Sequence, residues 1–319
     1  MRSLLIQAAV VSLAAALCGC DLVELAAPAR FQEEFDHRYP LEAGARLLVE
    51  NFNGSIQVSS WDQDEIRIQG AKFASSEELL ELLDIDIVAA GDFVQVRTLR
   101  PSSRRGAMGA RYVIHVPEDT VVDRLLSTNG RVEVTGVAGP VRVRTSNGRV
   151  EVRRVKGDVE VTTSNGSITC KQIEGDAKLR TSNGAIRVDG LRGRLRARTS
   201  NGSVKARLAP ETAGEPIEIR TSNGSVHLVL ETQPATDVIV TTTNASITVR
   251  APQSLAAGVR LKSTHASVET EFDLAEVKER SKHRLEGVVG SGGPLVELTT
   301  TNGAVRLLEL RPEDQSDEL

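Results

Sequence analysis

The residues of this chain that could act as metal ligands, nucleophiles or bases are either scattered or repeated, and neither pattern is typical of an active site. The histidines are His37, His115, His227, His265 and His283. None stands in a metal-binding pattern such as H-E-x-x-H, so we predict no metal centre and no cofactor. The serines lie in a repeated phrase and not in a G-x-S-x-G elbow, whereas a nucleophile needs one special environment. We therefore expect no catalytic residues.

One group of basic residues has a spacing that could bind a ligand. Four arginines each stand three residues before a repeated asparagine: Arg144, Arg180, Arg198 and Arg220. Thr162 interrupts this series, and four more cations lie close by in the sequence: Arg142, Lys178, Arg194 and Arg196. Because guanidinium groups pair bidentately with phosphates and carboxylates, the column could bind anionic glycans or phosphate polymers. The alternative is a solvated face whose charge is balanced by Glu133, Glu151 and Glu160.

The elements that must position these residues form a repeat. The phrase TSNG or a close relative places asparagines at intervals of 18, 22 or 21 residues, and a last copy reads TTNGAVRL. The repeated asparagines are Asn129, Asn147, Asn165, Asn183, Asn201, Asn223, Asn244 and Asn302. An earlier outlier, NFNGSIQV, contains Asn53, and His265 occupies an asparagine place, where we expect it to be a structural substitute.

Each copy follows the template N-G-x-V-x-V-x-x-V-x-G-x-V-x-V-x-T-S, which predicts two short strands with one buried face. Asn-Gly also favours antiparallel hairpins, but a meander would not demand the same residue at the same offset in every copy. Stacked coils about 4.8 Å apart do demand it. We predict an all-β fold, namely a single-domain parallel β-solenoid with coils of 18–22 residues.

The asparagines are predicted to form a structural ladder along one corner of the solenoid. Their amides can donate and accept, so stacked copies can bond to each other. Because asparagine tolerates a left-handed backbone and glycine follows it, we expect left-handed corners. Cys170 falls on an inward strand position and is expected to be a buried thiol.

Outside the repeats, residues 31–58 are predicted to form strands, and residues 100–110 a loop. Ser76 and its neighbours precede a leucine-rich run, which predicts one short helix in the N-terminal half that covers an end of the solenoid or packs beside it. A charged excursion over 273–293 precedes the last coil. Trp61, the only tryptophan, is expected to pack half-buried, with a ligand platform as the alternative.

The N-terminus has the features of a secretory signal. Arg2 precedes an apolar run from Leu4 to Leu17 that ends in Leu-Cys-Gly-Cys, which resembles the lipobox of bacterial lipoproteins. The resemblance implies cleavage before Cys20 and its lipidation. The alternative is an ordinary cleaved signal with Cys20 as a free thiol. The expected segments are a signal at 1–19, an anchor and linker at 20–38, the solenoid at 39–310 and a disordered acidic tail at 311–319.

Composition excludes some functions. With 39 Lys and Arg against 43 Asp and Glu, the net charge is −4, and aromatic residues are only 3% of the chain. Net acidity and scarce aromatic side chains argue against nucleic-acid binding. The same scarcity argues against a sugar-stacking cleft.

The order of several phrases resembles the bacterial putative-adhesin domain family, a domain of unknown function. The phrases are NGSIQV, WDQDEIRI, VPED, the run of TSNG coils and GGPLVELTTTNGAVRL, and the resemblance covers about residues 40–310. It implies a β-solenoid exposed in the cell envelope, without defined catalytic residues.

We therefore expect a non-catalytic, membrane-anchored lipoprotein that presents a repetitive surface for adhesion or for binding an envelope component. The expected partners are the membrane through the lipid, and an anionic glycan or another envelope protein. A carbohydrate-active β-helix enzyme is one alternative, resting on fold analogy alone. A self-assembling envelope scaffold is the other. Which membrane carries the anchor stays open.

Overall fold

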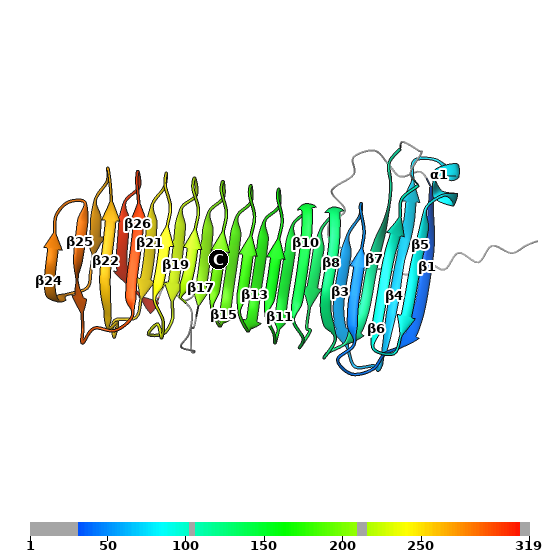
Figure 1. Cartoon of the computed structure of the whole chain (residues 1–319), viewed down its shortest axis with the longest axis horizontal. Helices are drawn as coiled ribbons and strands as arrows, with labels where there is room; N and C mark the ends of the chain where they lie inside the picture. The colour runs from blue at the N-terminus through cyan, green and yellow to red at the C-terminus, as the bar shows by residue number, and fades with distance from the viewer. Residues whose placement is uncertain (1–30, 102–105, 209–215, 313–319) are drawn as a thin grey trace, which may run out of the picture.

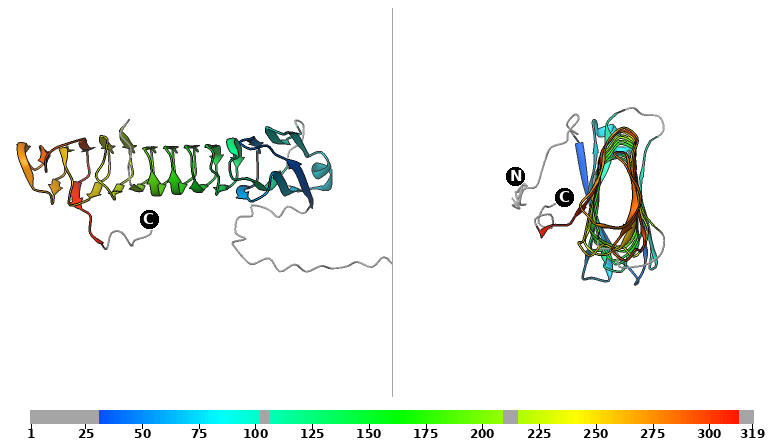
Figure 2. Two further views of the ribbon diagram at one scale, coloured as in Figure 1. Left: turned by 90° about the horizontal axis from the view of Figure 1, so that it is seen from below. Right: turned by 90° about the vertical axis from the view of Figure 1, so that its left-hand side faces the viewer.

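The computed structural model describes residues 31–101, 106–208 and 216–312. These residues form a long, flattened β-solenoid in which two sheets face each other along the whole length (Figures 1 and 2). One sheet has 13 strands and the other 14, and the apolar core fills the space between them. The prediction of an all-β parallel solenoid is confirmed.

The order of the strands in space runs along the solenoid axis in both sheets. In this order the 13-stranded sheet contains β1 (Phe31–Pro40), β4 (Glu65–Ala74), β7 (Met108–Pro117), β3 (Ile56–Trp61), β9 (Val132–Thr135), β11 (Val150–Val155), β13 (Ile168–Glu174), β15 (Ile186–Arg192), β17 (Val204–Leu208), β19 (Val226–Leu230), β21 (Ile247–Ala251), β27 (Val305–Glu309) and β23 (Val268–Thr270). The 14-stranded sheet contains β24 (Leu274–Arg280), β25 (Arg284–Val289), β22 (Ala257–Ser263), β26 (Leu295–Thr300), β20 (Val238–Thr241), β18 (Ile217–Arg220), β16 (Leu195–Arg198), β14 (Ala177–Arg180), β12 (Val159–Thr162), β10 (Val141–Asn147), β8 (Val121–Asn129), β2 (Arg46–Glu50), β6 (Phe93–Leu99) and β5 (Asp84–Ala90).

The central coils stack with like residues in register. A coil is one strand of the 14-stranded sheet, the TSNG corner and the next strand of the 13-stranded sheet. Val141 pairs with Val159, which pairs with Ala177, and all three side chains are buried. The pairing is parallel from β8 to β21, because each coil returns the chain to the same sheet one strand further along.

At both ends the spatial order of the coils departs from the chain order. The coil of β2 and β3 lies between those of β6–β7 and β8–β9. In the same way, the coil of β26 and β27 lies between β20–β21 and β22–β23. Antiparallel pairs occur only in these end regions of the described chain, for example β5 with β6 and β24 with β25.

The predicted helix is present as α1 (Glu77–Glu81), beside the N-terminal end of the solenoid (Figure 1). The Ser76 hydroxyl accepts a hydrogen bond from the Leu79 backbone N–H at 3.3 Å, which is an N-cap. Leu79 and Leu80 pack with Met108 in a second, small apolar cluster.

The first strand lies where strands were predicted, over residues 31–58. β1 begins at Phe31 and therefore overlaps the segment 20–38, which was expected to be anchor and linker. Its ten residues pair with β4, and Phe35 and Tyr39 pack against the core. The signal, Cys20, residues 102–105 of the expected loop and most of the acidic tail lie outside the described residues.

Candidate functional surface

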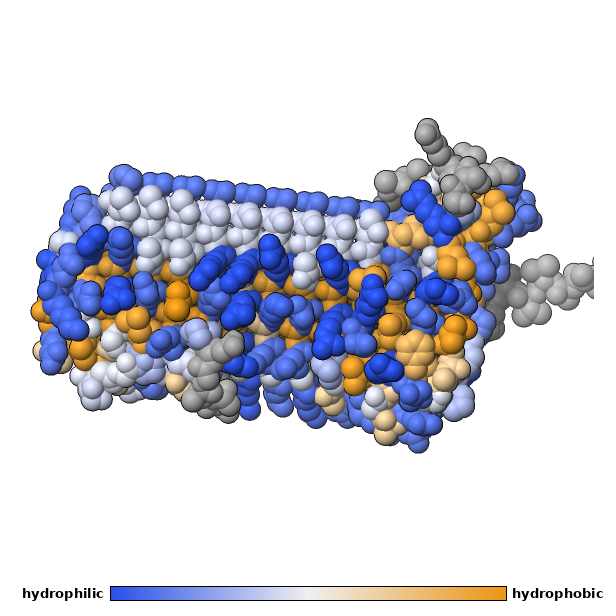
Figure 3. Space-filling model, in the orientation of Figure 1, coloured by the Kyte–Doolittle hydropathy of each residue, from blue (hydrophilic) through white to orange (hydrophobic). Residues whose placement is uncertain are grey.

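The eight repeated asparagines form one exposed ladder along the corner that follows the 14-stranded sheet. Seven of the eight donate through the side-chain Nδ2 to the Oδ1 of the asparagine one coil back, at 2.7 to 2.9 Å, and Asn129 at the end only accepts. The order is Asn302, Asn244, Asn223, Asn201, Asn183, Asn165, Asn147 and Asn129. Figure 3 shows the result as a continuous hydrophilic ridge along the upper edge of the molecule.

In the coils just beyond the two ends of the ladder, the corner residue makes a different hydrogen bond and the amide chain stops. Asn53, in the coil before Asn129, donates instead to the carbonyl of Met108 at 3.0 Å. In the coil beyond Asn302, His265 lies against Thr301, whose carbonyl oxygen is 3.3 Å from its Nδ1 and 3.0 Å from its backbone nitrogen. His265 thus occupies the corner position but does not extend the amide chain.

Buried threonines support the ladder from inside. In most coils the threonine two residues before the asparagine donates its hydroxyl to a carbonyl of the preceding corner; Thr181, for example, donates to Gly166 at 3.0 Å. The hydroxyl thereby satisfies a corner carbonyl that the strands do not pair. The small size of the inward threonine and its hydrogen bond to the corner explain why the position two residues before the asparagine varies so little between copies.

The expectation of left-handed asparagine corners is wrong. Among the described residues, only Arg154 and Gln172 are non-glycine residues with positive φ, at 51° and 56°. The glycine after each asparagine is needed for space: a Cβ on Gly184 would lie 1.9 Å from the carbonyl oxygen of Gly166. Ala245 takes this place in one coil. Asparagine is therefore selected here by its side-chain amide, and not by its backbone.

The basic column lies on the outer face of the 14-stranded sheet. Register places Thr162, Arg180, Arg198 and Arg220 on four adjacent strands, with Arg144 next to Thr162. A second row beside it contains Arg142, Glu160, Lys178, Arg196 and Glu218. We call these ten positions on β10, β12, β14, β16 and β18 the basic strip. Figure 3 shows strongly hydrophilic side chains gathered across the middle of one face.

The strip has a strong local charge. Seven of its ten residues are Arg or Lys, two are Glu and one is Thr, which gives a net charge of +5. The whole chain has a net charge of −4. Positive charge is therefore concentrated on one face of an acidic protein.

Glu218 binds three arginines at one end of the basic strip, on β16 and β18. Its carboxylate lies 2.6 Å from Arg220, 2.9 Å from Arg198 and 3.1 Å from Arg196, and its side chain is only 8% exposed. Burial alone would raise the pKa of Glu218, but the hydrogen bond from Arg198 and the three positive charges together hold this pKa below its ordinary value. Glu218 therefore stays ionised and orients the arginines.

The remaining strip cations differ in their pairing. Arg142 binds Asp123 at 2.6 Å, and Lys178 binds Glu160 at 2.7 Å. Within the described part of the chain, no carboxylate lies within 4 Å of Arg144 or Arg180. These two guanidinium groups are the least compensated positions of the strip.

The expected balancing carboxylates are mostly elsewhere. Glu133 and Glu151 lie on β9 and β11 of the 13-stranded sheet, where Arg131 contacts both and Arg153 also binds Glu151. Of the three expected carboxylates, only Glu160 is on the strip. Glu218 was missed, although its place two residues before Arg220 marks it as an outward residue of the same strand.

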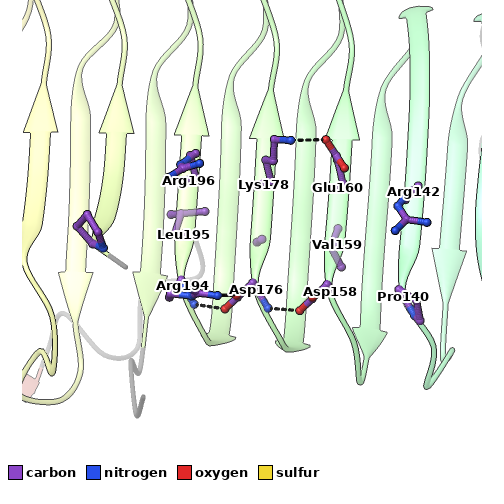
Figure 4. Close-up of a pocket in the computed structure, with 12 residues that line it drawn as sticks. Pro140, Arg142, Asp158, Val159, Glu160, Asp176, Lys178, Arg194, Leu195 and Arg196 are labelled. Carbon is purple, nitrogen blue, oxygen red and sulfur yellow. Dashed lines mark hydrogen bonds and ion pairs between the residues drawn. The ribbon is translucent and has the colours of Figure 1, made fainter. Parts of the chain in front are cut away.

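A shallow groove of about 400 Å³ borders the strip on the side away from the asparagine ladder. It contains the four cations that neighbour the column in sequence, Arg142, Lys178, Arg194 and Arg196 (Figure 4). Its floor is fixed by an aspartate series: Asp158 accepts from the backbone N–H of Asp176 at 2.9 Å, and Asp176 from that of Arg194 at 3.0 Å. The groove cations are thus held by internal ion pairs.

Trp61 and Cys170 have structural surroundings. The half-buried indole stacks on His115 with ring centroids 5.3 Å apart, and its Nε1 donates to the Glu65 carbonyl at 2.8 Å. The indole thereby crosses from β3 over β7 to β4, which supports the packing interpretation. Cys170 is fully buried, and burial raises the pKa of its thiol to about 12, so the thiolate is strongly disfavoured.

Metal ligands and membrane-spanning helices are both absent from the described residues. These residues contain no group of three or more His, Cys, Asp or Glu side chains able to hold a metal ion. None of the helical structure in the same ranges is long and apolar enough to cross a membrane.

A model of the family described as Toastrack DUF4097 matches residues 107–308. The chain belongs to this family. The Toastrack match spans the central coils, the ladder and the basic strip, and it confirms the family resemblance found in the sequence. A search of curated proteins gives no match.

Three solved structures are similar to this Toastrack chain over 87% of its length. A "putative cell adhesion protein" from Clostridium sporogenes is 11% identical, with 100% of that chain covered and a TM-score of 0.23. A "putative adhesin" from Bacteroides fragilis is 10% identical, with 97% covered and a TM-score of 0.39. Another from Parabacteroides distasonis is 8% identical, with 97% covered and a TM-score of 0.38. At these values the likeness carries no argument about function.

Proposed function

We propose that this protein is a non-catalytic, lipid-anchored envelope module that binds an anionic envelope polymer through the basic strip. The observation that carries the proposal is the concentration of seven cations and only two carboxylates on five adjacent strands of an acidic chain. Such a patch attracts polyanions by charge and by release of their counterions.

The geometry of the strip favours a linear ligand. Arg180, Arg198 and Arg220 stand on adjacent strands, so their backbones are about 4.8 Å apart along the solenoid axis. The five strands of the strip extend over about 19 Å at this spacing. A polymer with closely spaced phosphates or carboxylates can contact several guanidinium groups in turn when it lies along the axis.

The anchor part of the proposal rests on the sequence alone. Lipidation at Cys20 leaves ten residues before Phe31, where β1 begins. An extended linker of that length reaches at most about 35 Å, so the N-terminal end of the solenoid would stay close to the membrane.

The electrostatics of the strip speak against the alternative of a carbohydrate-active enzyme. A general acid at neutral pH needs a carboxyl group whose pKa is raised. The most buried strip carboxylate, Glu218, has its pKa lowered by the arginines around it, and Glu160 is bound by Lys178. These carboxylates position cations and are unsuited to protonating a leaving group.

The test is equilibrium binding of the chain from residue 20, with Cys20→Ser to prevent acylation, to isolated envelope glycans and anionic polymers. We expect saturable binding by the wild type and its loss when Arg180, Arg198 and Arg220 are all changed to Glu.

The matched control places the same three charge reversals outside the strip, at Arg149, Arg187 and Lys205, which are all exposed. Both triple variants have the same net charge, so only the position of the charge differs. Equal loss of binding in the two variants, or no binding by the wild type at tens of micromolar, would overturn the proposal.

A further inference from the structure

The two ends of the solenoid expose sheet edges of very different character. At the C-terminal end the edge strand of the 14-stranded sheet is β24, whose pairing with β25 has two register shifts. It carries Glu276, Lys278, Glu279 and Arg280. Irregular pairing and charged side chains are the devices by which edge strands avoid adding another strand.

The opposite edge of the same sheet is β5, and it has neither device along most of its length. All seven residues, Asp84–Ala90, pair continuously with β6 without a register shift. Five of them are apolar, and Val88 is 46% exposed. β5 therefore presents a regular sheet edge that can accept a further strand; the backbone N–H of Ile85 at its start donates to the Asp84 carboxylate at 2.9 Å and would exchange this bond on pairing.

We propose that β5 is a dimerisation edge, at which two copies of this chain pair antiparallel about a two-fold axis through Ile87. This register pairs all seven residues of both strands. It places Ile87 opposite its own copy and Ile85 opposite Ala89, on the face that continues the core. On the outer face it places Asp86 opposite Val88 and Asp84 opposite Ala90.

The charges of β5 favour the register with its axis through Ile87 over the register with its axis through Asp86. An axis through Asp86 would place two Asp86 carboxylates directly opposite each other, which destabilises a strand pair. With the axis through Ile87, every carboxylate of β5 faces an apolar residue of the other copy. An axis through Val88 also keeps the carboxylates apart, but it leaves Asp84 outside the paired strand.

The same comparison explains why the assembly closes at two copies. A filament would need β5 of one copy to pair with β24 of the next, whose irregular pairing and charged side chains oppose the addition of a strand. A two-fold pair uses β5 twice, so in the 14-stranded sheets of the dimer only the β24 edges stay open. The other N-terminal edge, β1, carries Glu33, Glu34 and Asp36, so we assign the pairing to β5.

The dimer also covers an opening at this end of the core. A groove of about 280 Å³ lies between the end of β1 and the end of β5, with Tyr39, Leu41 and Ala89 among its walls. Phe35, Ile85 and Ile87 are only partly buried against the core in the single chain. A second β5 would extend the sheet over these side chains.

The test is sedimentation velocity of the chain from residue 20, carrying Cys20→Ser, over a wide range of concentrations at physiological salt. We expect a reversible monomer–dimer equilibrium without larger species. Val88→Asp places a carboxylate opposite Asp86 of the other copy, twice per dimer, and should raise the dissociation constant roughly 2- to 30-fold. Val88→Lys should lower it.

Two further variants make the test specific. Val277→Asp makes the same change at an exposed valine, 51% accessible, on the guarded edge β24, and should leave the dimer unchanged. Asp86 is ion-paired with Arg97 on β6, so the rescue must not place a cation there. Asp86→Asn combined with Val88→Asp removes the carboxylate that faces the one introduced in the other copy and should restore the dimer. A chain that stays monomeric, equal effects of Val88→Asp and Val277→Asp, or no rescue by the double variant would each refute the pairing. Binding of anionic polymers is measured separately and does not depend on these outcomes.

Discussion

Replacing one interior asparagine of the ladder tests whether the amide chain stabilises the solenoid. Asn183 donates to Asn165 and accepts from Asn201, both at 2.7 Å, so Asn183→Ala removes two hydrogen bonds. Each such bond contributes about 0.5–1.5 kcal/mol net, and water can replace part of it at an exposed corner. We expect a loss of about 1–2 kcal/mol in the free energy of unfolding.

The measurement is urea unfolding followed by far-ultraviolet circular dichroism, with two matched variants. Asn302→Ala, at the end of the ladder, removes only the bond to Asn244 and should cost about half as much. Ser182→Ala changes an exposed neighbour of Asn183 whose backbone, and not its hydroxyl, bonds the next coil, and should cost almost nothing. If Asn183→Ala cost no more than Ser182→Ala, the ladder would not contribute to stability.

Three further predictions concern the strip and the coils. Glu218→Gln removes the carboxylate shared by Arg196, Arg198 and Arg220, so the same binding assay should show tighter polyanion binding while urea unfolding shows lower stability; weaker binding would show that the loss of the arginines' orientation outweighs the gain in positive charge. The pKa of Glu218 in the folded protein is below its ordinary value of 4.5, so its contribution to stability is full above pH 4.5 and is lost as pH falls through the folded pKa. In Glu218→Gln the free energy of unfolding should therefore fall less steeply as the solution is acidified. Gln172 has a left-handed backbone where Gly190 stands in the next coil, so Gln172→Gly should stabilise the protein by about 0.5–1 kcal/mol and Gln172→Val should destabilise it, as thermal unfolding would show.

Columns of like residues made the central coils predictable. Valines two apart, repeated at the same offset, predict two strands that stack on copies of themselves, and the asparagine series predicts the ladder. The end coils were not predictable in the same way. The copies around Asn53 and Asn302 look like ordinary coils, and nothing in their residues says that each lies between two other coils.

The pairing of charges depended on information that the repeat does not contain. Glu133 and Glu151 share one place in the template and Glu160 has another, but the template alone does not show that its two strands belong to different sheets, with the first two glutamates on one and the third on the other. Glu218 lies within the 22-residue interval, so counting forward from Asn201 does not align it with Arg196, although both stand five residues before a repeated asparagine. The left-handed backbone at Arg154 and Gln172 could not be predicted, because arginine and glutamine are not residue types that favour this conformation.

The salt dependence of polyanion binding tests the central claim most directly. If the strip neutralises about three to five charges of a flexible polyanion, the logarithm of the association constant should fall with the logarithm of salt concentration with a slope of about −2 to −3.5. Reversal of Arg180, Arg198 and Arg220 should abolish this binding, and reversal of Arg149, Arg187 and Lys205 should leave the slope unchanged. A slope near zero, or equal slopes for the two triple variants, would contradict binding by the basic strip.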